Sequence, residues 1–339
     1  MQRALVTGAT GLLGYHVCRR LREVGCEVHA LVRNPDAARW LQSEGATLAG
    51  GDVRDAASVD RAAANAEVIF HCAAVITTSG GWSQYRENNV LGTQNVLAAA
   101  RQHGARIVHA SSVADYGSRS RHRRDGNKVS EDTPFAVLAP HENYPRSKRE
   151  SEELILNAHR SGVVWACALR PDVMYGVRDR QFIPRAARLV SAPIVPVIGA
   201  GTAHLPVVHA GNVADAMVLA ATSDSAGGRA FNVANDFDIT YLDLIELAAK
   251  GLGRNPRIAH VPVSIARVGA RTLELLARTP LAARFPLPAS NSIDFVTKDN
   301  PFTSERARRE LGWSPRHHPA QEVPASFRWW LENRQSRSR

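Results

Sequence analysis

The chain has 339 residues, enough for a full hydrophobic core arranged as two lobes or as one enlarged α/β unit. Hydrophobic residues make up 44% of it, charged residues 22% and aromatic residues 6%, which is the profile of a helix-rich globular protein. The formal net charge of +10 would suit a nucleic-acid-binding protein. The sequence has no zinc-finger spacing, RNA-binding motif or long basic helix, however, so we expect no nucleic-acid partner.

The cysteines and the start of the chain bear on its cellular compartment. No C-x-x-C pair occurs, and three of the four cysteines lie in apolar runs, which favours reduced thiols over disulfides or a zinc site. A strand-like run begins at Ala4, so we expect no signal peptide. No window holds the roughly 18 apolar residues of a membrane-spanning helix. The sequence therefore predicts a cytoplasmic protein.

Short β-branched runs alternate with amphipathic stretches through the first two-thirds of the chain. The expected strands are 4–7, 27–32, 47–48, 68–72, 107–110 and 163–169. The expected helices between them are 11–24, 36–41, 56–63, 84–101 and 142–159. This alternation predicts an α/β fold, in which right-handed crossovers join the strands of a doubly wound parallel Rossmann sheet.

After residue 172 the pattern is less regular, because prolines interrupt a helix-and-loop region. Further strands are expected at 206–209 and 230–233, and helices at 241–251, 264–278, 304–311 and 325–332. We predict a dinucleotide-binding Rossmann domain of residues 1–172 with 205–236. A smaller, interleaved C-terminal substrate-binding lobe would comprise 173–204 with 237–333, followed by a disordered tail, 334–339.

A glycine-rich loop follows the first expected strand, with the spacing G-x-x-G-x-x-G. Glycines let a backbone turn tightly and approach a pyrophosphate, whose charge lies against N–H groups at the helix N-terminus. Glycines also mark ordinary turns, but this loop lies at the first strand–helix junction, where a dinucleotide motif belongs. The predicted cofactor-binding residues of the loop are Gly8, Thr10, Gly11, Leu12, Leu13 and Gly14.

Arg33 follows the second expected strand, where an acidic residue would bind the 2′-hydroxyl of an NAD ribose. An arginine there suits the 2′-phosphate of NADP, although Asp36 lies close enough to reach a ribose. We therefore expect NADP(H) in preference to NAD(H). After the third strand, Asp52 is expected to bind the adenine amino group, with Val53 beside the ring. The alternative role for Asp52 is to cap the helix that begins near Asp55.

Tyr144 and Lys148 are four residues apart at the start of an expected helix, so they share a face. A phenol has a pKa of about 10, and a nearby ammonium favours the phenolate. Tyr144 is therefore predicted to exchange a proton with a substrate hydroxyl while a nicotinamide exchanges hydride. Ser112 follows the fifth strand, at the sheet edge where ligands collect, and would orient the substrate oxygen; Ser111 is the competing candidate.

Other polar features have ordinary structural explanations. His71, His204 and His209 lack metal-ligand spacing with carboxylates or cysteines, so no metal site is expected. No G-x-S-x-G motif indicates a hydrolase. The basic amphipathic stretch 264–278 would lie on a membrane surface, cover an apolar pocket or form a helix with one buried face.

In order along the chain, these motifs resemble the extended short-chain dehydrogenase/reductase family, or NAD-dependent epimerase/dehydratase superfamily. The matching stretches are 7–14, 51–55, 71–74, 88–93, 110–112, 144–148 and 169–171. The resemblance implies that Ser112, Tyr144 and Lys148 are catalytic. It also implies further residues near the cofactor, the last two of them beside the nicotinamide: Ala73, Ala74, Asn88, Pro171 and Val173.

Within the family, stretches 167–176, 206–216 and 307–315 look like the 3β-hydroxysteroid and sterol-4-carboxylate dehydrogenase branch. Asn212 stands where nucleotide-sugar epimerases usually carry aspartate. Arg33 departs from the aspartate usual in the NAD-dependent steroid enzymes, which leaves the cofactor and the direction of reaction open. The resemblance also implies a homodimer built from exposed helices such as 84–101.

Three functions remain open from the sequence. The first is an NAD(P)-dependent oxidoreductase that interconverts a secondary alcohol and a ketone on a hydrophobic, 3β-hydroxysteroid-like substrate. The second is a nucleotide-sugar 4-epimerase or dehydratase that retains its cofactor and binds a diphosphate through Arg185 or Arg188. The third, a redox-sensing binding protein, ranks last because both Tyr144 and Lys148 are present.

Overall fold

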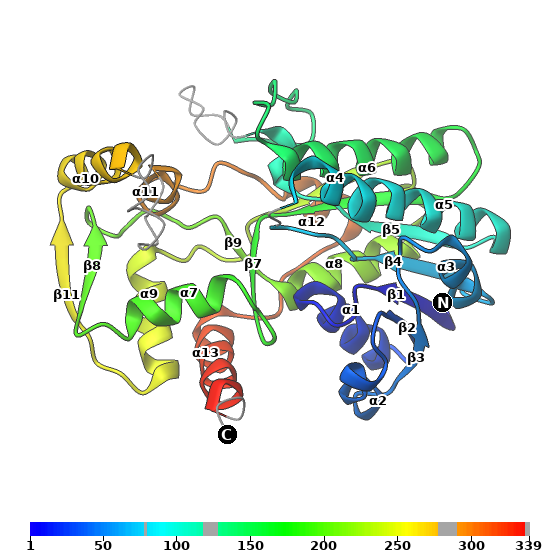
Figure 1. Ribbon diagram of the computed structural model, residues 1–339, viewed down its shortest axis with the longest axis horizontal. Helices are drawn as coiled ribbons and strands as arrows, with labels where there is room; N and C mark the ends of the chain where they lie inside the picture. Colours follow the sequence, from blue (N-terminus) through cyan, green and yellow to red (C-terminus); the bar gives the residue numbers. More distant parts are fainter. Residues whose placement is uncertain (78–79, 118–127, 277–289, 336–339) are drawn as a thin grey trace. The chain divides into compact units, whose positions relative to one another are not determined.

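The computed structural model describes residues 1–77, 80–117, 128–276 and 290–335 (Figure 1). The chain divides into two compact units. The first comprises Met1–Met174, Val208–Asp236 and Pro301–His317, and the second Tyr175–Val207, Phe237–Asn300 and His318–Arg339. Residues 301–317, predicted to lie in the substrate lobe, thus belong to the Rossmann unit. The reason is that α12 (Glu305–Leu311) packs on the sheet strand β10 (Ala230–Val233).

The first unit is built on a seven-stranded parallel sheet with the order β10-β6-β5-β4-β1-β2-β3. Its other strands are β1 (Arg3–Thr7), β2 (Glu27–Val32), β3 (Ala46–Gly50), β4 (Val68–His71), β5 (Arg106–Ala110) and β6 (Ala166–Pro171). Helices α3, α5 and α6 pack in one layer and α1, α8 and α12 in another, on opposite faces of the sheet (Figure 1). The predicted doubly wound Rossmann fold is confirmed.

The helical segments of this unit alternate with its strands. They are α1 (Leu12–Glu23), η1 (Asp36–Ala38), α2 (Trp40–Ser43), α3 (Ala56–Ala63), α4 (Gly81–Tyr85), η2 (Arg86–Leu91), α5 (Gly92–His103), η3 (Val113–Tyr116), α6 (Asn143–Arg160), α8 (Ala210–Thr222) and η5 (Asp224–Ala226). Leu5, Ile69 and Ile107 pair across β1, β4 and β5 and are fully buried. Apolar side chains of α3, α5 and α6 cover them and form the core on that face.

Several predicted boundaries are wrong for local reasons. The expected helix 84–101 is three segments, because the π-helical turn η2 separates α4 from α5. The expected strand 163–169 starts only at Ala166, since the Val163 amide donates to the Ala158 carbonyl and closes the end of α6. Helix α8 was missed altogether. It is buried on nearly all sides, so its sequence lacks the amphipathic period that reveals a surface helix.

The second unit is mainly helical. Its elements are α7 (Phe182–Val190), β8 (Ile194–Ile198), α9 (Tyr241–Leu252), β11 (Arg257–Val261), α10 (Val263–Leu276), α11 (Ser290–Thr297) and α13 (Pro319–Gln335). Strands β8 and β11 pair in parallel, and α9 packs against α7 and α13. Two short strands, β7 (Val173–Tyr175) and β9 (Val207–His209), lie where the chain passes from one unit to the other.

Two expectations about the second unit fall partly outside the described residues. The stretch 264–278 is helical as α10 up to residue 276, and Ile265 and Val268 on it are exposed. The predicted disordered tail, 334–339, is wrong for residues 334 and 335, which are the last residues of α13; the remaining four lie outside the described part. None of the described helices is long and apolar enough to cross a lipid bilayer.

Candidate active site

The residues predicted for the site follow strands whose carboxyl ends meet at one edge of the sheet. The register pairs Thr7 of β1 with His71 of β4, and His71 with His109 of β5. The next residue of β5, Ala110, pairs with Leu169 of β6. Residues directly after β1, β4 and β5 are thereby brought to one edge: Gly8, Cys72, Ala73, Ser111 and Ser112. In doubly wound sheets this is the edge that binds ligands.

The glycine loop joins β1 to α1 and has no room for a side chain at Gly8 or Gly14. Gly8 has a φ of +70°, and a Cβ there would lie 2.7 Å from the Ala73 amide nitrogen. A Cβ on Gly14 would lie 2.2 Å from the Gly8 carbonyl oxygen, which accepts the Gly11 amide at 2.9 Å. No described side chain caps α1, so its first N–H groups suit a pyrophosphate. The remaining predicted loop residues are half-buried or buried: Thr10, Leu12 and Leu13.

Arg33 is exposed just after β2, and Asp52 is half-buried after β3. Arg54 donates to the Asp52 carboxylate through its main-chain amide at 2.9 Å and through its guanidinium at 2.9 Å and 3.1 Å. These bonds lower the pKa of Asp52, and Arg33 adds to the effect. The alternative role of Asp52 as a helix cap is wrong: Asp55 caps α3 by accepting the Ala57 amide at 3.1 Å.

Three predicted cofactor contacts, Val53, Ala73 and Ala74, are half-buried. The Ala73 amide donates to the Thr7 hydroxyl at 3.2 Å, which ties the segment after β4 to the end of β1. The Val53 carbonyl accepts a hydrogen bond from Asn95 of α5 at 2.8 Å. The main chain at Ala73 and Val53 is therefore held in place by β1 and α5.

Two adjacent asparagines on η2 have different environments. Asn88, the predicted cofactor residue, is half-buried and donates to the Gln84 carbonyl at 2.8 Å. Asn89 is buried, and its carboxamide bonds both the amide and the carbonyl of Val75, at 2.8 Å and 3.0 Å. It also donates to the Ser147 hydroxyl of α6 at 2.9 Å. Asn89, which no sequence motif predicts, links the segment after β4 to the helix that carries Tyr144.

The two serines after β5 differ in their contacts. Ser111 is buried and its hydroxyl donates to the Asp115 carboxylate at 2.6 Å. Ser112 is half-buried, is the N-cap residue of η3, and accepts the Ala114 amide at 3.1 Å. Ser112 is therefore the more accessible hydroxyl of the two.

Helix α6 brings Tyr144 and Lys148 to the same edge. Tyr144 is half-buried in the first turn, with its ring centroid 6.4 Å from that of Tyr85. Lys148 lies one turn further on, is only 4% exposed, and donates to the Ala110 carbonyl at 2.6 Å. The phenol and the ammonium are thus on one helix, beside the end of β5 from which Ser112 follows.

The ammonium of Lys148 is in an unusual electrostatic environment. Burial lowers its pKa to about 8, because the charged form loses its hydration; Asp115, Cys72 and Glu152 oppose this shift. Near neutral pH the group remains largely protonated. A buried cation placed one turn from a phenol favours the phenolate form of that phenol.

A buried ion pair lies beneath the site. Arg170 of β6 donates to the Glu152 carboxylate of α6 at 2.9 Å, and to the Tyr116 hydroxyl at 2.7 Å. The Tyr116 hydroxyl in turn donates to Asn232 of β10 at 2.9 Å. A buried carboxylate and guanidinium are tolerated only when both are paired and hydrogen-bonded, as they are here. The network joins α6, η3, β6 and β10 beneath the ligand-binding edge.

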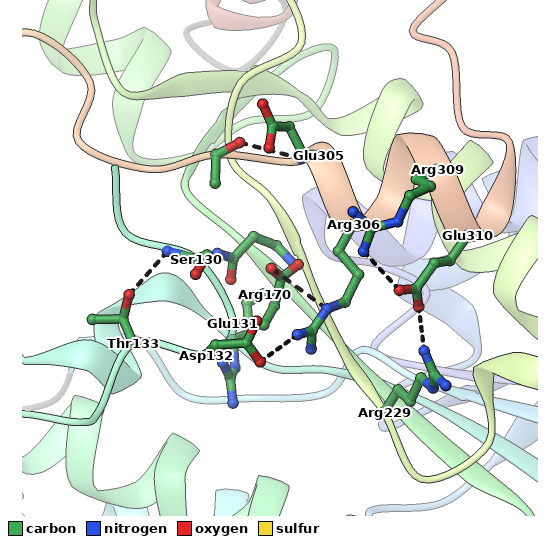
Figure 2. Close-up of polar contacts among 12 residues, drawn as sticks. Ser130, Glu131, Asp132, Thr133, Arg170, Arg229, Glu305, Arg306, Arg309 and Glu310 are labelled. Carbon is green, nitrogen blue, oxygen red and sulfur yellow. Dashed lines mark hydrogen bonds and ion pairs between the residues drawn. The ribbon is translucent and has the colours of Figure 1, made fainter. Parts of the chain in front are cut away.

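The segment that leads from residue 128 toward α6 is anchored by charge. Glu131 is buried and accepts the Asn232 amide at 2.7 Å. Arg306 of α12 donates to Asp132 at 2.6 Å and lies 3.8 Å from Glu131 (Figure 2). Further along, the Ala136 carbonyl accepts Arg149 of α6 at 3.0 Å. None of these anchors was predicted, because they join positions more than 100 residues apart or positions without a motif.

The residues expected beside the nicotinamide follow Arg170. Pro171, the last residue of β6, is buried, and Val173 is half-buried. The Val173 amide donates to the side chain of Asp172 at 2.8 Å. Their backbone thus leaves the sheet at β6, two strands from β4 and next to the strand that precedes Ser112.

The family model described as "NAD dependent epimerase/dehydratase family" matches residues 4–234, about two-thirds of the chain. The chain belongs to this family. The predicted resemblance is confirmed, and the protein is an NAD(P)-dependent enzyme of the oxidoreductase and epimerase/dehydratase superfamily. In this fold, the glycine loop at the N-terminus of the first helix presents N–H groups to a dinucleotide.

Curated relatives of this family member include two reductases. The chain is 28% identical to the 4-hydroxy-2-methyl-3-oxo-4-farnesyl-3,4-dihydroquinoline-1-oxide ketoreductase of Stigmatella aurantiaca, over 93% of this chain and 92% of the relative. It is 29% identical to the 2-alkyl-3-oxoalkanoate reductase of Stenotrophomonas maltophilia (strain K279a), over 92% and 94%. A 3beta-hydroxysteroid-dehydrogenase/decarboxylase of Arabidopsis thaliana is 26% identical, over 92% of this chain and 59% of the relative.

Solved structures of the same fold cover nearly the whole chain. The structure of gox2253 superposes with a TM-score of 0.76 at 27% identity, over 98% of this chain and 99% of that one. A dTDP-glucose 4,6-dehydratase from Streptomyces venezuelae, solved with NAD bound, has a TM-score of 0.73 at 23% identity, over 99% and 98%. The second likeness extends to the fold alone, which family members with different reactions share.

Proposed function

We propose that this enzyme interconverts a ketone and a secondary alcohol on a hydrophobic substrate of the 3β-hydroxysteroid type, with NADP(H) as its preferred cofactor. The observation that carries the proposal is the arrangement of Tyr144 and Lys148 on α6, with Lys148 bonded to Ala110 two residues before Ser112. A phenol, a buried ammonium and an accessible hydroxyl at the ligand-binding edge are the groups that carbonyl reduction requires.

In the direction of reduction, Tyr144 donates its proton to the substrate oxygen, while Lys148 stabilises the phenolate that results. The Ser112 hydroxyl donates to the same oxygen and orients the carbonyl. When bound, the nicotinamide supplies the hydride. The glycine loop would hold the pyrophosphate, and the segment with Pro171 and Val173 would support the nicotinamide ring.

The names of the relatives support a hydrophobic substrate. The two reductases are named for oxo compounds that carry a farnesyl or an alkyl group, and the plant relative for a 3β-hydroxysteroid. In this chain, Ile265 and Val268 leave an apolar face exposed on α10 of the second unit, which the proposal assigns to substrate binding. We also expect a homodimer in solution, which light scattering would measure.

The preference for NADP(H) rests on Arg33, which is exposed after β2 and offers a cation to a 2′-phosphate. The test is fluorescence titration of the purified protein with NADPH and with NADH, for wild type and Arg33→Asp. We expect Arg33→Asp to weaken NADPH binding roughly tenfold or more, because a hydrogen bond to a charged group contributes about 1.5–3 kcal/mol. Arg61→Asp, at an exposed position on α3, is the matched charge control.

The same protein is then assayed for NADPH consumption with a 3-ketosteroid and with a 2-alkyl-3-oxoalkanoate. Turnover of either ketone supports the proposal, and the ratio of the two kcat/KM values identifies the substrate class. Tight NADH binding without an effect of Arg33→Asp would contradict the NADP(H) preference. Cofactor that stays bound through purification, with no ketone turnover, would favour a nucleotide-sugar epimerase instead.

A further inference from the structure

A buried carboxyl group that the proposed chemistry does not use lies in the turn after β5. Asp115 on η3 is fully buried, and its Oδ2 accepts the Ser111 hydroxyl at 2.6 Å. Its Oδ1 is also buried and meets no hydrogen-bond donor among the residues that the structure describes. A buried carboxylate oxygen without a donor costs free energy unless the group gains a proton or a nearby cation compensates its charge.

Two adjacent residues of α6 hold this turn beside a cation. Lys148 donates to the carbonyl of Ala110, at the start of the turn, at 2.6 Å. Arg149 donates from Nε to the carbonyl of Asp115, near its end, at 3.2 Å. The turn is thus clamped at both ends by one helix. Asp115 thus lies on the turn that Lys148 itself contacts, and the two side chains interact electrostatically.

Other ionisable groups around Lys148 are paired or neutral. Glu152, one turn further along α6, accepts a bifurcated hydrogen bond from the guanidinium Nε of Arg170, at 2.9 Å and 3.2 Å, and another bond from its Nη2. Three groups near the ends of β4 and β5 are uncharged near neutral pH because burial shifts their pKa values: His71, Cys72 and His109. Of the two acidic groups beside Lys148, Glu152 is hydrogen-bonded to a guanidinium. The Asp115 carboxylate has no guanidinium hydrogen bond among the described residues.

We propose that Asp115 is a positioning residue for the reaction, and that its carboxyl group keeps the buried Lys148 ammonium charged while Tyr144 transfers its proton. The inference rests on the proposed function for its catalytic consequence. Burial lowers the pKa of Lys148 to about 8, and Asp115 is the first of the charged groups that oppose this shift. Burial and then Glu152 raise the pKa of Asp115 well above its usual range, while the Ser111 hydroxyl, Arg170 and Lys148 oppose this shift. Asp115 and Lys148 thus each favour the charged form of the other, and the two groups titrate as a pair.

Direct titration of Lys148 tests the inference without any substrate. The chain has four lysines, Lys128, Lys148, Lys250 and Lys298. Protein labelled with ¹³Cε-lysine therefore gives four resonances, which single Lys→Arg changes at the other three positions assign. We expect the Lys148 midpoint near pH 8 in wild type. Asp115→Asn should lower it by about one pH unit or more, since a nearby opposite charge shifts a pKa by about that amount.

Asp215→Asn is the matched control, because Asp215 is also a buried aspartate of the same unit. It pairs with Arg20 of α1 and with Arg316, which follows α12. It should leave the Lys148 midpoint unchanged. If Asp115→Asn does not fold, Ser111→Ala replaces it. Loss of the hydroxyl donor raises the pKa of Asp115 further, so the Lys148 midpoint should fall in the same direction by a smaller amount.

Kinetics separate this inference from the proposed function. In Asp115→Asn, the alkaline limb of kcat/KM for ketone reduction should move to lower pH together with the Lys148 midpoint. A midpoint unchanged in folded Asp115→Asn overturns the inference, whatever the activity. A midpoint that falls, in a protein whose wild type reduces no ketone, supports the coupling of Asp115 to Lys148 and overturns the proposed function alone.

Discussion

Lys148 of α6 donates a hydrogen bond to the main-chain carbonyl of Ala110, the last residue of β5, at 2.6 Å. Because the acceptor is backbone at the end of a buried strand, the ammonium is directed into the site and held away from solvent. Ser112 follows two residues after Ala110, and Tyr144 precedes Lys148 by one helical turn. A single contact thus relates the three predicted catalytic residues to one another.

Tyr144→Phe removes the proposed proton donor and leaves the ring. We expect kcat for ketone reduction to fall roughly 10²–10⁴-fold, the usual contribution of general acid–base catalysis, with little change in NADPH affinity. Tyr85→Phe is the control, since its ring lies 6.4 Å from that of Tyr144 while its hydroxyl donates to the Ile76 carbonyl. Near-normal turnover in Tyr144→Phe would mean that another group supplies the proton.

Lys148→Met removes the buried ammonium, and its effect depends on pH. In wild type, kcat/KM for reduction should fall above about pH 8, as Lys148 loses its proton. Between that pH and the usual lysine value of 10.5, the unfolded chain binds more protons at this position than the folded one. Lys148 therefore contributes a stability that increases as pH rises through this window.

The measurement for Lys148 is a pair of pH series, one of kcat/KM and one of urea unfolding, for wild type and Lys148→Met. Buried cysteines such as Cys18, whose pKa is raised by burial, also titrate at alkaline pH and act in the opposite direction, so the difference between the two proteins is the informative quantity. The free energy of unfolding of wild type should rise relative to that of Lys148→Met as pH rises from about 8 toward 10. A constant difference would contradict the lowered pKa of Lys148.

The expected strands and the glycine loop could be predicted because each depends on local sequence. Strand 27–32 and helix 56–63 match their predicted bounds to the residue, since their apolar patterns are local. The edge that gathers Gly8, Ser112 and Tyr144 follows from parallel topology alone. These are the parts of the site that a chain-order argument reaches.

Asn88 and Asn89 provide a test that separates cofactor binding from folding. Asn89→Ala should destabilise the protein by about 1–3 kcal/mol, because it leaves buried partners at Val75 and Ser147 without their hydrogen bonds. Asn88→Ala, at a half-buried position whose side chain donates to the Gln84 carbonyl, should cost less, about 0.5–1 kcal/mol. If the predicted role of Asn88 holds, that variant instead weakens NADPH binding; urea unfolding and fluorescence titration distinguish the two effects.

Gly14→Ala tests the packing of the glycine loop. A Cβ there would lie 2.2 Å from the Gly8 carbonyl oxygen, so β1 and α1 must move apart. Overpacking of this kind costs about 1–3 kcal/mol or more, and the displaced loop should lose cofactor affinity as well. Gly269→Ala on α10 is the matched helical control, because no described atom lies within 4 Å of the added Cβ. It should stabilise the protein by about 0.5–1 kcal/mol, as measured by thermal unfolding.

What the sequence could not reveal are contacts between distant positions. The Asn232 side chain accepts a hydrogen bond from Tyr116, and its main-chain amide donates to Glu131. Both partners lie more than 100 residues earlier, and no motif marks any of the three. Asn212 shows the converse. It is noticed in the sequence because it departs from a family pattern, yet it is fully buried and bonds Asp236 and the backbone of His317. Its identity is explained by packing within the unit, without reference to a ligand.

His209 gives the chain a sensitivity to acid that is separate from the active site. The residue is buried between His16 and His317, with ring centroids at 5.1 Å and 4.8 Å. Burial, followed by the neighbouring histidines and Arg19, lowers the pKa of His209 to about 2 from its ordinary 6.5. Below pH 6.5 the unfolded chain binds a proton at this position that the folded chain does not, so stability falls as pH falls.

His209→Asn isolates this contribution. His209 Nδ1 accepts the Gly211 amide at 3.2 Å as the N-cap of α8, and asparagine is a favourable N-cap that does not titrate. We expect similar stability for the two proteins at pH 8. Between pH 6 and 4, wild type should lose up to about 1.4 kcal/mol more per pH unit than His209→Asn, the slope of one unmatched proton. Urea unfolding across this range measures it, and parallel pH profiles would show that His209 is protonated within the fold.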